Sequence, residues 1–169
     1  MLLRVCAVAA IIIGFAFTIN AQASASSRAS ATIVTPIGIT NTVNMNFGNV
    51  AVNNAIAGIV TLSATGDRTA SGGVTIPVSA GTITAASFEV TGSAAYTYSI
   101  TLPTSIIVYN GSFSMTATTF TSNPLPGAGI LGSGGKQTLN VGASLIIPAA
   151  QPAGLYVAAM PFDVTVNYN

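Results

Sequence analysis

The stretch IIVYNGSFSMTA, residues 106–117, predicts a β-hairpin. Asn110 and Gly111 stand between two apolar runs, and Asn-Gly favours the tight turn of a hairpin because both residues tolerate a positive φ. On the return strand, Phe113, Met115 and Ala117 alternate with polar residues, so that they share one face. The stretch therefore indicates an antiparallel sheet with one buried side.

The same alternation continues outward from this hairpin in both directions, and no sustained helical period follows residue 23. Expected strands lie at residues 32–40, 43–47, 60–64, 74–78, 86–90, 96–102, 139–147 and 156–168. Gly, Pro and Asn separate them, and Ser122–Gly135 (SNPLPGAGILGSGG) is expected to be a loop by composition. Short strands at this spacing predict an all-β, immunoglobulin-like antiparallel β-sandwich. A barrel is the alternative.

The amino-terminus predicts a cleaved signal peptide. Met1–Arg4 carries one positive charge, Val5–Ile19 is almost free of polar residues, and Ala21-Gln22-Ala23 is a small-x-small cleavage signal. The apolar run of about 15 residues is shorter than the roughly 20 that span a bilayer, which favours a leader over a retained anchor. The cut is expected between Ala23 and Ser24, with Ala25/Ser26 as the alternative.

This cleavage defines the expected domain organisation. Residues 1–23 form the signal peptide, and residues 24–169 form a single β-sandwich domain without a transmembrane segment. The mature protein is expected in the periplasm, on the cell surface or outside the cell. Cys6, the one cysteine, lies in the leader, so the mature chain would have neither a thiol nor a disulfide.

Charge is scarce in this chain. Lysine and arginine together number 4, aspartate and glutamate 3, and removal of Arg4 leaves three of each. So few basic residues argue against nucleic-acid binding, and a net charge near zero favours association. Hydrophobic residues make up 50% of the sequence, which indicates a real core. The polar surface must then consist of Thr, Ser, Asn and Gly.

The residues that usually carry catalysis are missing or scattered. There is no histidine, so the commonest general base and metal ligand is absent. The carboxylates Asp67, Glu89 and Asp163 are far apart in sequence, and such scattered acids are expected to be solvated or paired with a neighbour, as Asp67 with Arg68. Neither the paired acids of a glycosidase nor the clustered acids of a calcium site are evident. We expect a protein that is not an enzyme and has no metal or cofactor.

Two other features of the sequence could suggest a binding site, but neither has the pattern that such a site needs. The glycines of residues 127–135 lack the Lys-Ser/Thr that completes a phosphate-binding loop. Tyr96 and Tyr98 could stack on a sugar, but they share the parity of Ile100, which favours packing in the core.

Several segments, taken in order, resemble a known family. They are IVTPIGI (33–39), MNFGNV (45–50), FEVTG (88–92), YTYSITLP (96–103) and VTVNY (164–168). Their order resembles the secreted bacterial family called domain of unknown function 4402, over nearly the whole mature chain. Gly154-Leu155-Tyr156, followed by an alternating final strand, is also similar to fimbrial subunits of the spore coat U and archaic chaperone–usher type.

The fimbrial resemblance implies a pilin-like surface or filament protein. In such proteins an incomplete immunoglobulin-like sandwich is completed by a strand from a neighbouring subunit. Implied partners are further copies of the chain arranged head to tail, other fimbrial subunits and a periplasmic chaperone. The sequence lacks the disulfide cysteines that many pilins have.

Strand donation needs an extended segment with alternating apolar residues, and head-to-tail insertion of it builds a fibre. Thr32–Thr40 offers Ile33, Ile37 and Ile39 as a candidate strand-donor face. The alternative is that Thr32–Thr40 forms the first strand of its own sandwich. The alternative function is a surface binding module that recognises carbohydrate or protein through loops such as Ser122–Gly135.

Overall fold

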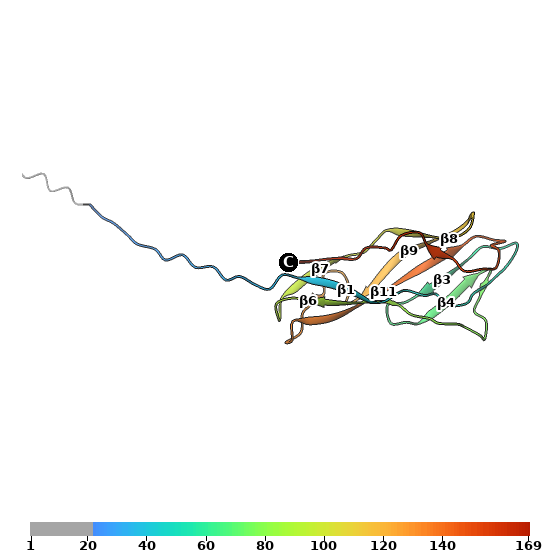
Figure 1. Cartoon of the computed structure of the whole chain (residues 1–169), viewed down its shortest axis with the longest axis horizontal. Helices are drawn as coiled ribbons and strands as arrows, with labels where there is room; N and C mark the ends of the chain where they lie inside the picture. Colours follow the sequence, from blue (N-terminus) through green and yellow to red (C-terminus); the bar gives the residue numbers. More distant parts are fainter. Residues whose placement is uncertain (1–21) are drawn as a thin grey trace, which may run out of the picture. The chain divides into compact units, whose positions relative to one another are not determined.

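A computed structural model describes residues 22–169, and all regular structure in this range is β-strand (Figure 1). The signal-peptide prediction falls almost entirely outside the described residues, as does Ala21. By its internal contacts the chain divides into residues 1–32 and residues 33–169, and the second unit is the β domain. Its strands are β1 (Gly38–Val43), β2 (Ala51–Val52), β3 (Gly58–Leu62), β4 (Arg68–Gly72), β5 (Val74–Thr75), β6 (Ala86–Thr91), β7 (Thr97–Thr101), β8 (Ser105–Asn110), β9 (Phe113–Asn123), β10 (Gly129–Ile130), β11 (Lys136–Ile147), β12 (Val157–Ala158) and β13 (Thr165–Tyr168).

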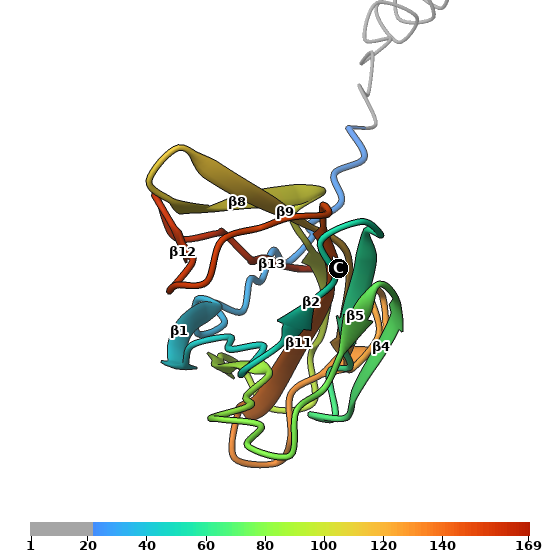
Figure 2. The ribbon, with the colours of Figure 1, turned by 90° about the vertical axis from the view of Figure 1, so that its right-hand side faces the viewer.

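Strand β11 organises the largest sheet. Its first half pairs with β6 and its second half with β3, while β9 pairs along the opposite edge. The sheet runs β1-β6-β11-β9-β8-β12, with β4 added beyond β3. A second sheet has the order β10-β7-β13, and β2 pairs with β5. All pairs are antiparallel, and the strands curl around an interior with β11 at the middle (Figure 2). The predicted antiparallel sandwich is confirmed.

The hairpin predicted at residues 106–117 is also confirmed. Strands β8 and β9 are joined at Asn110, which pairs with Phe113, and Gly111 has a φ of 58°. Met115 and Ala117 are buried, as their shared parity predicts, whereas Phe113 beside the turn is half exposed.

The interior contains two hydrophobic clusters. The first lies between the two larger sheets and includes Val90, Tyr98, Leu139 and Val166. The second, farther along β11, includes Val60, Met115, Leu145 and Ile147. Alternate residues of β3, β6 and the first part of β11 are buried, because successive side chains of a strand point to opposite faces.

The loop predicted over Ser122–Gly135 is wrong in its middle. Strand β10 lies inside this range and pairs with β7, and Leu131 after it is buried with 1% of its surface exposed. Gly129 lies directly on the ring of Tyr98, since a Cβ added there would be 2.6 Å from ring atoms. The glycine therefore permits a close approach between strands, which composition alone presents as a loop signal.

Two of the predicted strands are shortened at a proline. The alternation at 156–168 is interrupted between β12 and β13, where Met160 is 77% exposed and Pro161 follows it. The alternation at 74–78 ends with β5, because Pro77 removes a backbone donor and Val78 points into solvent. In both cases apolar periodicity continues past the point where proline stops the ladder.

Hydroxyl groups cover part of the outer face of the large sheet. The cross-strand partners are Thr69, Thr61, Ser144, Thr118 and Ser105, one from each of β4, β3, β11, β9 and β8. Thr61 Oγ1 and Ser144 Oγ are 2.9 Å apart and share a hydrogen bond. Neutral hydroxyl groups thus provide the polar surface that this weakly charged chain requires.

Arg68, the first residue of β4, makes its hydrogen bonds to backbone carbonyls of its own domain. Its Nη1 donates hydrogen bonds to the carbonyl of Phe47 and to that of Asn49 at 2.9 Å. Gly48 between them has a φ of 70°, and a Cβ there would lie 2.7 Å from Arg68 Nη1 and 2.4 Å from the Ala80 carbonyl. Arg68 therefore fastens this turn to the sheet.

We expect Arg68→Met to lower the free energy of unfolding by about 1–2 kcal/mol, because two carbonyls lose a charged donor while the aliphatic packing is kept. Two buried nitrogens of Arg68, Nε and Nη2, have no hydrogen-bond partner within residues 22–169. The loss of stability should therefore be smaller than for an arginine whose guanidinium nitrogens are all hydrogen-bonded. Urea unfolding followed by circular dichroism measures the change. Lys136→Met, which alters an exposed pair, is the control.

Candidate functional site

The three isoleucines of the candidate donor face, Ile33, Ile37 and Ile39, do not lie together in the structure. No residue from 22 to 37 belongs to a helix or strand. Ile33 is 97% exposed. Ile37 and Ile39 instead pack against the first core cluster, and β1 pairs with β6 in the register Ile39–Val90. Residues 38–40, at the carboxyl-terminal end of Thr32–Thr40, therefore lie in the chain's own sheet, and Ile33 lies outside it.

Between Ile33 and β1, hydrogen bonds among Thr35, Ser93 and Tyr168 hold the chain to the domain. We call this set of bonds the clasp. The Thr35 amide donates to Ser93 Oγ at 2.9 Å, and the Tyr168 hydroxyl donates to the Thr35 carbonyl at 2.8 Å. The same hydroxyl accepts from the Ser93 amide at 2.6 Å. Gly92 makes room for it, since a Cβ there would be 2.1 Å from the hydroxyl oxygen. Residue 35 is thus held while the segment before it has no strand partner.

Removal of one hydroxyl should open this clasp. We expect Tyr168→Phe to reduce the free energy of unfolding by about 1–2 kcal/mol, because the Ser93 amide and the Thr35 carbonyl both lose their partner. Hydrogen exchange at the Ser93 amide should accelerate more than at the amides of β11. Tyr109→Phe is the matched control, and equal exchange rates at Ser93 in the two variants would contradict the clasp.

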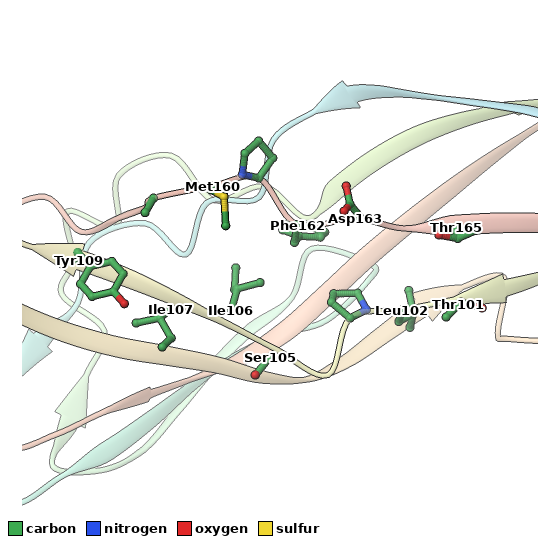
Figure 3. A pocket seen from close by; sticks show the side chains of 13 residues that line it. Thr101, Leu102, Ser105, Ile106, Ile107, Tyr109, Met160, Phe162, Asp163 and Thr165 are labelled. Atoms are coloured by element: carbon green, nitrogen blue, oxygen red, sulfur yellow. The ribbon is translucent and has the colours of Figure 1, made fainter.

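A groove of about 510 Å³ lies beside β8 (Figure 3). One wall comes from β8 and the end of β7, and the other from residues 159–165. Its apolar lining includes Leu102, Ile106, Ile107, Met160 and Phe162. The groove is therefore a mainly apolar depression between edges of the two larger sheets.

The floor of the groove is continuous with the core. Phe162 contacts Phe120 with ring centroids 5.4 Å apart and Phe88 at 6.4 Å. Ile106 packs against the second core cluster. The depression thus reaches side chains that the sandwich otherwise buries.

The backbone beside the groove is only partly paired. On its outer edge, β8 meets β12 at Tyr109–Val157 and Val108–Ala158. Within residues 22–169, Ser105–Ile107 has strand partners only on the β9 side. An open length of sheet edge therefore borders an apolar depression, which is the arrangement that an added strand requires.

Charged groups do not converge on a chemical centre in the described part of the chain. The one ion pair within residues 22–169 joins Lys136 Nζ to Glu89 Oε1 at 2.9 Å, with both side chains exposed, so it adds little stability. The expected Asp67–Arg68 pair is not formed there. Asp67 accepts a hydrogen bond from Thr65 at 2.8 Å, and Asp163 lines the groove.

Residues 22–169 contain no group of three or more Cys, Asp or Glu side chains placed to hold a metal ion. In the same range, no helix has the length and apolarity to span a membrane.

The two tyrosines differ in their surroundings. Tyr98 is fully buried, as its parity predicts, but Tyr96 is 45% exposed and rests against Tyr168 with ring centroids 5.5 Å apart. Strand β7 begins only at Thr97, so the alternation does not extend back to Tyr96. The expectation that Tyr96 packs in the core is wrong.

Sequence patterns identified the segment but not the groove. Met160 and Phe162 lie within the strand expected at residues 156–168, and the break at Pro161 instead makes them groove residues. The only local signal was the proline inside an alternating run.

Fold and site together define an antiparallel β-sandwich domain with an unpaired amino-terminal segment and an open sheet edge. The chain matches the family model described as Domain of unknown function (DUF4402) over residues 37–168. The protein therefore belongs to the DUF4402 family, and the resemblance to that family found from the sequence is confirmed. No curated protein and no solved structure matches the chain.

Proposed function

We propose that this protein is an exported structural subunit of pilin-like type that assembles head to tail by strand donation. The observation that carries the proposal is the segment before Thr35, which includes the 97% exposed Ile33 and lies outside every strand. Thr35 is clasped to the domain, so a donated segment would be firmly attached to its own subunit. The near-zero charge favours such association.

The location follows from the leader. Export to the periplasm, cell surface or exterior would place copies together with fimbrial subunits and a periplasmic chaperone as candidate partners. A chaperone would protect an open sheet edge that otherwise promotes aggregation. Amino-terminal sequencing of the exported protein should begin at Ser24, or at Ser26 if the alternative site is used; an intact Met1 on exported protein would contradict the leader.

The test of assembly compares two purified chains, one beginning at Ser24 and one at Val34. We expect the first to form oligomers whose mass grows with concentration and the second to stay monomeric, as measured by light scattering after size exclusion. Ile33→Ser should weaken assembly, whereas Ile130→Ser, which removes another exposed isoleucine, should not. A Ser24 chain that is monomeric at every concentration, or two chains that oligomerise equally, would refute strand donation.

A second candidate is carbohydrate binding, and Tyr96 is the observation that favours it. Its ring is half exposed and supported by Tyr168, and the Tyr96 carbonyl accepts from the Leu131 amide at 2.9 Å, next to the exposed Ile130. A supported, exposed aromatic ring beside the segment Ser122–Gly135 suits stacking on a sugar. Binding on a glycan array that is lost in Tyr96→Ala and kept in Tyr109→Ala would support it; no binding by the native chain would exclude it.

A further inference from the structure

Residues 24–33 (SASSRASATI) have the period of a β-strand. The odd positions are small or apolar, namely Ala25, Ser27, Ala29, Ala31 and Ile33. The even positions are all polar and include Arg28. In extended conformation these two sets point to opposite sides. The segment therefore has one face suited to an apolar surface and one suited to water.

The groove beside β8 offers the complementary surface. Its floor is apolar, and the open edge at Ser105–Ile107 supplies backbone donors and acceptors that an extended chain can pair with. Figure 3 shows this groove as elongated, with Thr101 and Thr165 towards one end and Tyr109 and Met160 towards the other. An added strand would lie along this direction, next to β8.

Size and side-chain volume fit such an occupant. The groove volume of about 510 Å³ is available for the side chains on one face of an added strand. Small alanine side chains allow a strand to enter between two walls, and Ile33 supplies the one large side chain for the floor. The small side chains of the segment thus suit a groove with walls on both sides.

Charge distinguishes this occupant from other extended peptides. Asp163 is the one acidic or basic residue among those lining the groove, and Arg28 is the one charged residue between 24 and 33. Arg28 lies on the polar face, which would point away from the floor, and Asp163 is exposed beside Phe162. The two charges have opposite sign and would meet at the rim of the occupied groove.

We propose that the groove between β8 and residues 159–165 of one copy receives residues 24–33 of a second copy as an added strand. This inference rests on the proposed function and adds to it the acceptor surface, the residues donated and a rim contact between Arg28 and Asp163. The exposed edge of β8 is then covered in the assembly by the strand of the next subunit.

The test uses the full mature chain from Ser24 and measures its association by analytical ultracentrifugation. Met160→Glu should weaken association about tenfold or more, since a large apolar contact is replaced by a charge. Leu155→Glu, which alters an even more exposed apolar residue outside the groove, should have little effect. Asp163→Arg should weaken association about threefold, and adding Arg28→Glu should restore it.

The outcomes separate this inference from the proposal beneath it. If the native chain assembles through its amino-terminal segment while Met160→Glu and Asp163→Arg leave association unchanged, the acceptor groove is wrong and strand donation stands. If the native chain never assembles, both fail. If it is monomeric and Met160→Glu makes residues 24–33 sensitive to protease, the segment occupies the groove of its own chain, which overturns the assignment to a second copy.

Discussion

Replacement of Gly142 by alanine is expected to destabilise the domain by about 3 kcal/mol or more, at the upper end of what overpacking a core costs. Gly142 is buried in β11. A Cβ there would lie 2.2 Å from the Leu62 carbonyl oxygen and 2.6 Å from the Ala64 amide nitrogen. Both are backbone atoms, at the end of β3 and just beyond it, so no side chain can move aside to relieve the clash.

The position of Gly142 adds to this cost. Here β11 passes from its pairing with β6 to its pairing with β3, and its register with β9 shifts between Gly142 and Ser144. A displaced backbone would disturb three neighbouring strands. Because domains of this kind have a total stability of about 5–15 kcal/mol, a large fraction of it would be lost.

The measurement is the urea midpoint of Gly142→Ala beside that of Gly134→Ala. Gly134 lies in an exposed turn with no atom within 4 Å of an added Cβ, so its replacement should change the midpoint very little. Equal midpoints for the two variants would show that the packing around Gly142 yields easily and would contradict the expectation.

Gly142 also illustrates how far the sequence predicts the fold. Alternation identified the strand at 139–147, the hairpin at Asn110-Gly111 and the strand at 86–90, because local periodicity and turn residues determine them. The pairing of β11 with β3, β6 and β9 depends on contacts distant in sequence. Local alternation places Gly142 in a strand, but nothing local shows that it is packed against another strand's backbone.

In the candidate site, too, some features follow from the local sequence and others from contacts distant in sequence. Ile33 was identified as a candidate donor residue, since that depends on alternation near one end of the chain. Its position outside every strand was not predicted, because residues 32–40 were expected to form one strand. The clasp by Tyr168 was not, because the two bonded residues are 133 positions apart. The open edge of β8 was not predicted either, since it depends on how much of the edge the two-residue β12 covers.

Tyr98 is the side chain whose truncation should cost the most. It is fully buried in the first core cluster. Its hydroxyl donates to Gln137 Oε1 at 2.7 Å, and the same oxygen accepts from the Ile130 amide at 2.9 Å. The ring supports Gly129, so Tyr98 and Gln137 together hold β10 against the domain.

Tyr98→Ala is therefore expected to lower the free energy of unfolding by about 3–5 kcal/mol, the range for removing a large aromatic ring from a core. Tyr98→Phe keeps the ring and should lose only about 1 kcal/mol, the value of one hydrogen bond. Tyr109→Ala, at a half-exposed tyrosine of β8, is the control for loss of a ring. Similar losses at Tyr98 and Tyr109 would show that burial of Tyr98 is not what stabilises the fold.

Alkaline pH should reveal the same burial in the native chain. Burial raises the pKa of the Tyr98 phenol above its ordinary value of 10.0, because the phenolate would be charged inside the core. Above about pH 10 the unfolded chain loses this proton while the folded chain keeps it, so the unfolded state binds fewer protons and stability falls as pH rises. Below that pH the Tyr98 phenol is protonated in both states, and its contribution to the stability of the fold is fully present.

Urea unfolding between about pH 8 and about pH 11 measures this dependence around the ordinary phenol pKa. The native chain should lose stability more steeply than Tyr98→Phe at the alkaline end, so the difference between them should shrink as pH rises. The two chains share all other titrating groups, so Tyr98→Phe is the matched reference for the native chain. Parallel curves would mean that Tyr98 ionises as easily in the folded domain as in the unfolded chain, and its burial between β10 and β11 would then be refuted.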